Sequence, residues 1–116
     1  MKYASILLFT FLFPAVASAQ EGIALKKQRS CISISHIYRN AAHYRNDGER
    51  PETTYKFIQQ AFNSEAHEFG IKESDIKKII NKVYFDPQFQ FAGGEALETQ
   101  MYQICMGKYK PIEPLK

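Results

Sequence analysis

Two cysteines, Cys31 and Cys105, are separated by most of the length of the chain. A bond between them would close a loop around most of the sequence, and such a loop removes conformational entropy from the unfolded state. In the chain-entropy model the bond contributes about 4 kcal/mol to stability, a large share of the total for a small domain. If the cysteines are joined, the first and last elements of the fold must lie together.

The N-terminal residues decide whether that bond is expected, because disulfides persist mainly outside the cytoplasm. Lys2 precedes an almost wholly apolar run over 5–13, and we expect Pro14 to end this run as a helix. Small residues at 17–19 suit a signal peptidase, so the pattern predicts a cleavable signal peptide over 1–19. An uncleaved membrane anchor is the alternative, but the run is much shorter than the roughly 20 residues that span a bilayer.

A signal peptide predicts a periplasmic or secreted protein and favours a disulfide between Cys31 and Cys105. A reactive thiol and a metal-binding pair are the alternatives. Neither has support, because the chain has no CxxC spacing and no histidine adjoins either cysteine. No later stretch is apolar enough to cross a bilayer, so we expect no stable membrane insertion after signal cleavage.

The remaining sequence carries helical patterns, with apolar residues at three- and four-residue spacing between Gly and Pro punctuation. Helices are predicted over 27–46, 51–62, 72–85 and 95–106, and the second either stops near Asn63 or continues to Phe69. No run of β-branched residues alternates as a strand would. The sequence therefore predicts an all-α fold, a small bundle of four or five short helices whose first and last helices are tied by one disulfide.

Two segments outside these helices complete the predicted domain organisation. Residues 88–94 are predicted to form a loop, and we expect the rings of Phe89 and Phe91 both to pack over the bundle. Residues 20–107 form the predicted helical domain. Residues 108–116 contain two prolines and are predicted to be an extended C-terminal tail.

The three histidines do not have the spacing of a metal site. His36 and His43 share a helix face but are roughly 10 Å apart along the axis, at about 1.5 Å of rise per residue. His67 and Glu68 begin like a zinc-protease motif, yet Ile71 stands where the second histidine would be. We expect solvent-facing histidines, no metal and no cofactor, with a pH-sensing role as an alternative.

Other catalytic patterns are also missing from the sequence. No serine lies in a Gly-x-Ser-x-Gly elbow, and there is no glycine-rich phosphate loop. The carboxylate pairs Glu65/Glu68 and Glu95/Glu98 have the three-residue spacing typical of a solvated helix face. We therefore expect a protein that is not an enzyme.

The charge of the chain indicates no nucleic-acid partner. Its net charge is only +3, and Lys2 contributes to it but would leave with the signal peptide. Lysines on the predicted helix 72–85 could meet an acidic partner or an anionic membrane. The alternative is that they form an ordinary solvated helix face.

Aromatic residues are abundant, with seven Tyr, nine Phe and no Trp. We expect that not all the tyrosines are buried, and tyrosine beside arginine is typical of protein interfaces. The predicted partner-binding residues on the first helix are Tyr38, Arg39, Tyr44 and Arg45. The alternative is that the tyrosines lie at the core edge with only their hydroxyl groups in water.

Four segments resemble a group of small secreted helical proteins of Gram-negative bacteria that have no assigned function. They are Cys31 with its helix, the turn over 45–51, the segment 83–87 and the closing segment 102–105. This resemblance implies a similar fold and supplies no active residue.

The run over 31–35 followed by Tyr38 is also similar to the first helix of periplasmic immunity proteins of type VI secretion systems. The turn over 48–51 departs from their pattern. We expect a non-enzymatic factor that binds another protein, as an inhibitor or immunity protein or as an accessory subunit of an envelope complex. The alternative is a periplasmic stress chaperone, a class similar only in its helical plan and single disulfide.

Overall fold

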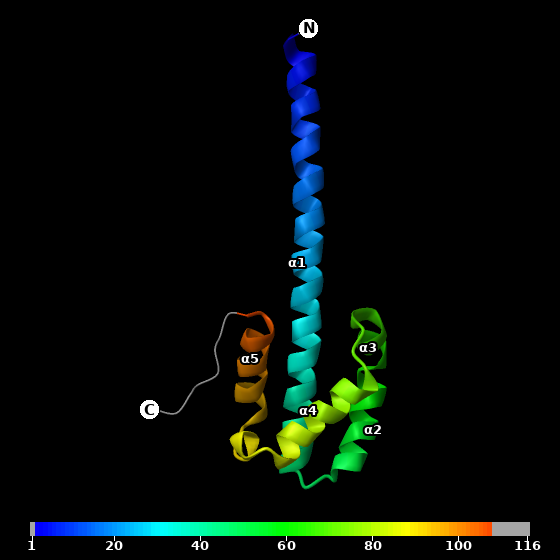
Figure 1. Cartoon of the computed structure of the whole chain (residues 1–116), viewed down its shortest axis with the longest axis vertical. Coiled ribbons are helices and arrows are strands. Elements are labelled where there is room, and N and C mark those ends of the chain that lie inside the picture. The colour runs from blue at the N-terminus through cyan, green and yellow to red at the C-terminus, as the bar shows by residue number, and fades with distance from the viewer. Residues whose placement is uncertain (1, 108–116) are drawn as a thin grey trace, which may run out of the picture.

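One long helix, α1 (Lys2–Asn46), forms the axis of the molecule, and the other elements pack around its C-terminal half (Figure 1). The structure is a computed structural model that describes residues 2–107, with side chains described from Gly22 onward. The remaining elements are α2 (Pro51–Ala61), α3 (Asn63–Phe69), α4 (Glu73–Phe85), the 3-10 turn η1 (Pro87–Phe89) and α5 (Gly94–Cys105). Every element in the described part of the chain is helical, which confirms the all-α prediction.

The first helix begins earlier than predicted. α1 passes through Pro14 and is continuous from Lys2, so the expectations of a stop at Pro14 and a start near Lys27 are wrong. A proline inside a helix removes one N–H from the hydrogen-bond ladder and crowds the carbonyl four residues earlier, which destabilises the helix but does not always end it. The N-terminal half of α1 projects away from the other helices, and the side chains of 22–29 are exposed. The predicted signal-cleavage position lies inside this projecting helix, while the predicted tail over 108–116 lies outside the described residues.

The core lies where α1 meets α4, α5 and α2. In Figure 1, α5 and the α2–α3 pair flank α1, and α4 crosses it. Ala41 and Ala42 are fully buried, and their small side chains let the neighbouring helices approach α1 closely. Each buried isoleucine or leucine contributes about 2 kcal/mol of transfer free energy. The buried apolar core residues beside the alanines are Ile37, Tyr38, Ile58, Ile76, Ile79, Ile80, Val83, Phe89 and Leu97.

The helix ends follow from local residues. α2 and α3 are separate because Phe62 leaves helical geometry, with φ −108° and ψ 17°, which settles the alternative left open by the sequence. Gly70 then ends α3 with φ 68°, a left-handed conformation that favours glycine. At the start of α4, the Asp75 carboxylate accepts a hydrogen bond from the Lys72 N–H at 2.9 Å. The predicted boundaries of α4 and α5 are each within one residue of those observed.

The rings of Phe89 and Phe91, in the predicted 88–94 loop, differ in their exposure to solvent. Phe89 is 9% exposed and belongs to the core, as expected, but Phe91 is 92% exposed, so the expectation that it packs over the bundle is wrong. Residues 87–89 form a 3-10 turn at the start of this predicted loop. Such a turn advances about 120° per residue, so side chains two positions apart do not share a face. The half-buried Ala92 packs against the core instead.

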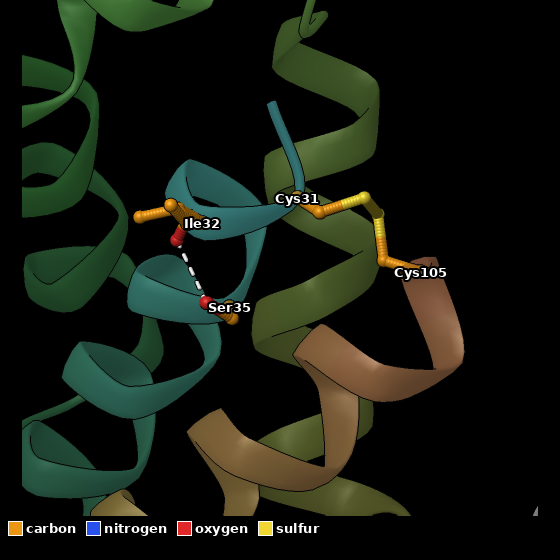
Figure 2. The surroundings of a disulfide bond; sticks show 4 residues. All are labelled: Cys31, Ile32, Ser35 and Cys105. Carbon is orange, nitrogen blue, oxygen red and sulfur yellow. Dashed lines mark hydrogen bonds between the residues drawn. A yellow bond between two sulfur atoms is a disulfide. The ribbon is translucent and has the colours of Figure 1, made fainter. Parts of the chain in front are cut away.

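The predicted disulfide is present and joins α1 to the end of α5 (Figure 2). The Cα atoms of Cys31 and Cys105 are 5.6 Å apart, and Cys31 is buried. One turn further along α1, the Ser35 hydroxyl donates a hydrogen bond to the Ile32 carbonyl at 2.7 Å, which satisfies this buried side chain. The bond therefore ties the first and last helices together, as the sequence predicted.

Replacing both cysteines, Cys31→Ala with Cys105→Ala, should lower the free energy of unfolding by about 4 kcal/mol, because the unfolded chain regains the entropy of an open loop. Chemical denaturation of the variant beside the oxidised and the reduced protein measures this. The reduced protein should resemble the variant. Equal stability of the oxidised protein and the variant would contradict this role for the bond.

Candidate functional site

The predicted partner-binding tyrosines are engaged within the bundle. Tyr38 is only 8% exposed, and its ring centroid lies 6.3 Å from that of Phe89. Burial raises the pKa of the Tyr38 hydroxyl above its ordinary value. Tyr44 is half-buried, with its ring centroid 5.4 Å from that of Phe57 on α2. Tyr38 would have to leave the core to reach a partner, whereas the outer edge of Tyr44 remains accessible.

Arg45 donates hydrogen bonds to backbone carbonyls that have no hydrogen-bond partner within a helix. Its guanidinium donates to the Val83 carbonyl at 2.7 Å, to the Ala92 carbonyl at 2.9 Å, and to the Phe89 carbonyl. The last carbonyls of a helix lack intrahelical partners, and Val83 lies in the last turn of α4. Arg45 therefore fixes the end of α4 and the η1 loop against the end of α1.

Arg45→Ala should lower the free energy of unfolding by about 3 kcal/mol, because three carbonyls lose a charged donor in a partly buried site. Arg50→Ala is the matched control. The Arg50 side chain is 82% exposed, so its loss should cost less than about 0.5 kcal/mol. Denaturant titration of both variants measures the difference, and similar losses would contradict the capping role of Arg45.

Arg39 belongs to a charged seam between α1 and α5. The Glu98 carboxylate lies between two side chains of α1, with His36 Nε2 at 3.0 Å from one oxygen and Arg39 Nη1 at 3.3 Å from the other. The Glu98 side chain is 25% exposed, so the expectation that the Glu95/Glu98 pair forms a solvated face is wrong for Glu98. The cause is tertiary, since positions 36 and 39 share the face of α1 that meets α5.

His43 extends this seam toward the start of α5. Its Nε2 atom lies 3.9 Å from a Glu95 oxygen. A Cβ atom at Gly94 would collide with the His43 ring, so a larger residue there would displace this ring from its present position. The two α1 histidines share a face, as predicted, and each meets its own carboxylate. Across the described residues, no three His, Cys, Asp or Glu side chains gather in a way that could hold a metal ion.

Glu98→Gln should lower the free energy of unfolding by about 1 kcal/mol at low salt, because Arg39 loses its carboxylate partner. The loss should be smaller at high salt, since salt screens partly exposed charges. Glu95→Gln is the control, because the Glu95 side chain is 83% exposed. Thermal melts at low and high salt measure this, and equal behaviour of the two variants would show that the seam does not depend on Glu98.

A partly apolar surface lies elsewhere, in a shallow groove between α2 and α4. The groove has a volume of about 430 Å³. Phe85, at the end of α4, is 68% exposed at one end of it. We call this surface the α2–α4 groove; it is lined by Pro51, Glu52, Tyr55, Lys56, Lys77, Ile80, Asn81 and Phe85.

The neighbouring Tyr84 explains why Phe85 faces outward. The Tyr84 hydroxyl donates to the Glu49 carbonyl at 2.8 Å and lies 2.7 Å from the buried Thr54 hydroxyl, which must then act as the donor. Partial burial is the main cause that raises the pKa of Tyr84 above its ordinary value. Adjacent helical residues point about 100° apart, so fixing Tyr84 inward turns Phe85 toward solvent.

Sequence reasoning missed this groove, although a signal was present. Tyr84 continues the four-residue spacing of Ile76 and Ile80, whereas the adjacent Phe85 falls outside it. A large aromatic residue left outside the apolar stripe of an amphipathic helix indicates an exposed ring. Phe85 forms a groove together with Tyr55 and Pro51 only because α2 packs beside α4. The sequence alone does not show this packing.

Comparison with known proteins assigns no family to the chain: no family model, no curated protein and no solved structure matches it. Among the residues that the structure describes, no helix combines the length and the apolar character needed to cross a membrane.

Proposed function

We propose that this chain is an exported, non-enzymatic factor that binds another protein through the α2–α4 groove. In this proposal the signal peptide over 1–19 directs the chain to the periplasm or beyond. There it acts as an inhibitor or immunity protein, or as an accessory subunit of an envelope complex. The disulfide supports the proposed compartment, because such bonds persist outside the cytoplasm.

The observation that carries the proposal is the exposure of Phe85 beside a preformed apolar groove. A fixed aromatic ring loses little side-chain entropy on binding, and burying it fully contributes about 2 kcal/mol. Tyr55 and Ile80 extend the apolar surface, and Lys56 and Lys77 provide a charged rim. An apolar centre with a polar rim is the usual anatomy of a protein interface.

A stress chaperone is the second candidate, and the seam between α1 and α5 is the observation that favours it. His36 and His43 face Glu98 and Glu95. These contacts join the first and last helices and help to keep the domain folded. Such a protein would bind many clients weakly, whereas an inhibitor or subunit binds one partner tightly.

Affinity capture with the mature, oxidised protein and two variants separates these proposals. Phe85→Ala should weaken binding of the partner by about 2 kcal/mol, because the exposed ring of the groove is lost. Phe91→Ala is the matched control, since Phe91 is 92% exposed and does not line the groove. Captured proteins are identified by mass spectrometry, and their affinities are then measured with purified components.

One stoichiometric partner that Phe91→Ala retains and Phe85→Ala loses is the expected result. A partner held equally by both variants would place the binding surface elsewhere. A long series of weak clients that grows as the pH falls would favour the chaperone.

A further inference from the structure

We infer that the α2–α4 groove accepts an acidic amphipathic helix of the partner protein, with one large apolar residue seated between Tyr55 and Phe85. This inference rests on the proposed function and names the chemistry that the groove would recognise. It depends on the charge of the rim, on the hydrogen-bonded backbone of both walls, and on the apolar floor.

The rim of the groove has an excess of positive charge. Lys56 and Lys77 are exposed on its two walls, and the Lys77 ammonium lies 5.2 Å from the centroid of the Tyr55 ring. Ion pairs among the described side chains use only arginine and histidine as cations, which leaves both ammonium groups available. The single acid of the groove, Glu52, already lies 3.5 Å from Arg50. Carboxylates on a partner would therefore be attracted to this rim.

The backbone of the groove walls favours a helical occupant. Both walls are α-helices, whose N–H and C=O groups bond within each helix, so the groove has no strand edge to which an extended peptide could add. Affinity must come from side-chain packing and charge. A helix suits such a surface because its own backbone groups are already hydrogen-bonded when it enters an apolar groove.

The floor of the groove suits one large anchor side chain. Tyr55 and Ile80 form its apolar base, and Phe85 stands at one end. The part of α4 that lines the groove, 77–85, spans about 12 Å at about 1.5 Å per residue, which matches roughly two turns of a bound helix. The volume of about 430 Å³ leaves room for one bulky side chain in this open groove.

The lysines of α4 are not arranged for a flat anionic surface. Lys77 borders the α2–α4 groove, whereas Lys78 and Lys82 border a different hollow on the α1 side, together with Ile34 and Phe69. A membrane would contact one continuous face. The division of the lysines between two faces favours a partner that enters the groove.

The test uses two synthetic helical peptides of equal length with the same leucine positions, one with glutamate and one with lysine on the polar face. NMR titration of the mature, oxidised protein measures binding and the residues affected. The acidic peptide should bind at least tenfold more tightly, with shifts centred on 51–56 and 77–85. The double variant Lys56→Glu with Lys77→Glu should reverse that preference. Lys78→Glu with Lys82→Glu is the matched control and should preserve it.

Several results would overturn the inference. In the NMR titration, these are equal affinities for the two peptides or chemical-shift changes centred outside the groove. Binding to phosphatidylglycerol vesicles that the acidic peptide does not displace would also overturn it. So would self-association through the groove, measured by sedimentation. The proposed function is tested separately by Phe85→Ala against the captured partner. If that partner depends on Phe85 but is insensitive to reversal of Lys56 and Lys77, the protein-binding function stands and the acidic helix is wrong.

Discussion

The guanidinium of Arg45 holds together the part of the fold in which helices end and chains turn. At the end of α1 it donates to carbonyls from the last turn of α4, from η1 and from the segment before α5. These groups have no helical partners of their own, so a single charged donor at a partly buried site fixes three segments at once. The disulfide fixes the other end of α5 against α1. The bundle is thus anchored at two points, and the apolar core fills the space between them.

This anchoring has a consequence for the surface. With Val83 held by Arg45, and with the Tyr84 hydroxyl bonded to the Glu49 carbonyl and to Thr54, the end of α4 has a fixed rotation. Phe85 is thereby exposed beside α2, and the same packing forms the groove. Because the groove is built from helices braced in this way, a partner would meet a preformed surface, and little conformational entropy would be lost on binding. This preorganisation supports the protein-binding proposal.

The sequence predicted the features that depend on local pattern and on the cysteine pair. The helix-ending residues and the apolar stripe of α4 identified the elements, and Cys31 and Cys105 identified the cross-link. Pro14 was wrongly expected to end a helix, because proline disfavours a helix interior without always breaking it, and α1 is continuous through this position. Tertiary contacts were not predictable, since the pairing of Glu98 with His36 and Arg39, and the reach of Arg45, depend on how helices far apart in the chain pack. The groove was missed for the same reason.

Side-chain oxidation footprinting of the purified complex with its captured partner tests the central claim most directly. Hydroxyl radicals modify exposed aromatic rings, and mass spectrometry measures the rate at each residue with and without the partner. The account predicts slower oxidation at Tyr55 and Phe85 in the complex, while Phe91, which is 92% exposed and outside the groove, keeps its rate. Unchanged rates at Tyr55 and Phe85, with protection at Tyr102 on α5, would contradict it and place the partner on the other side of the bundle.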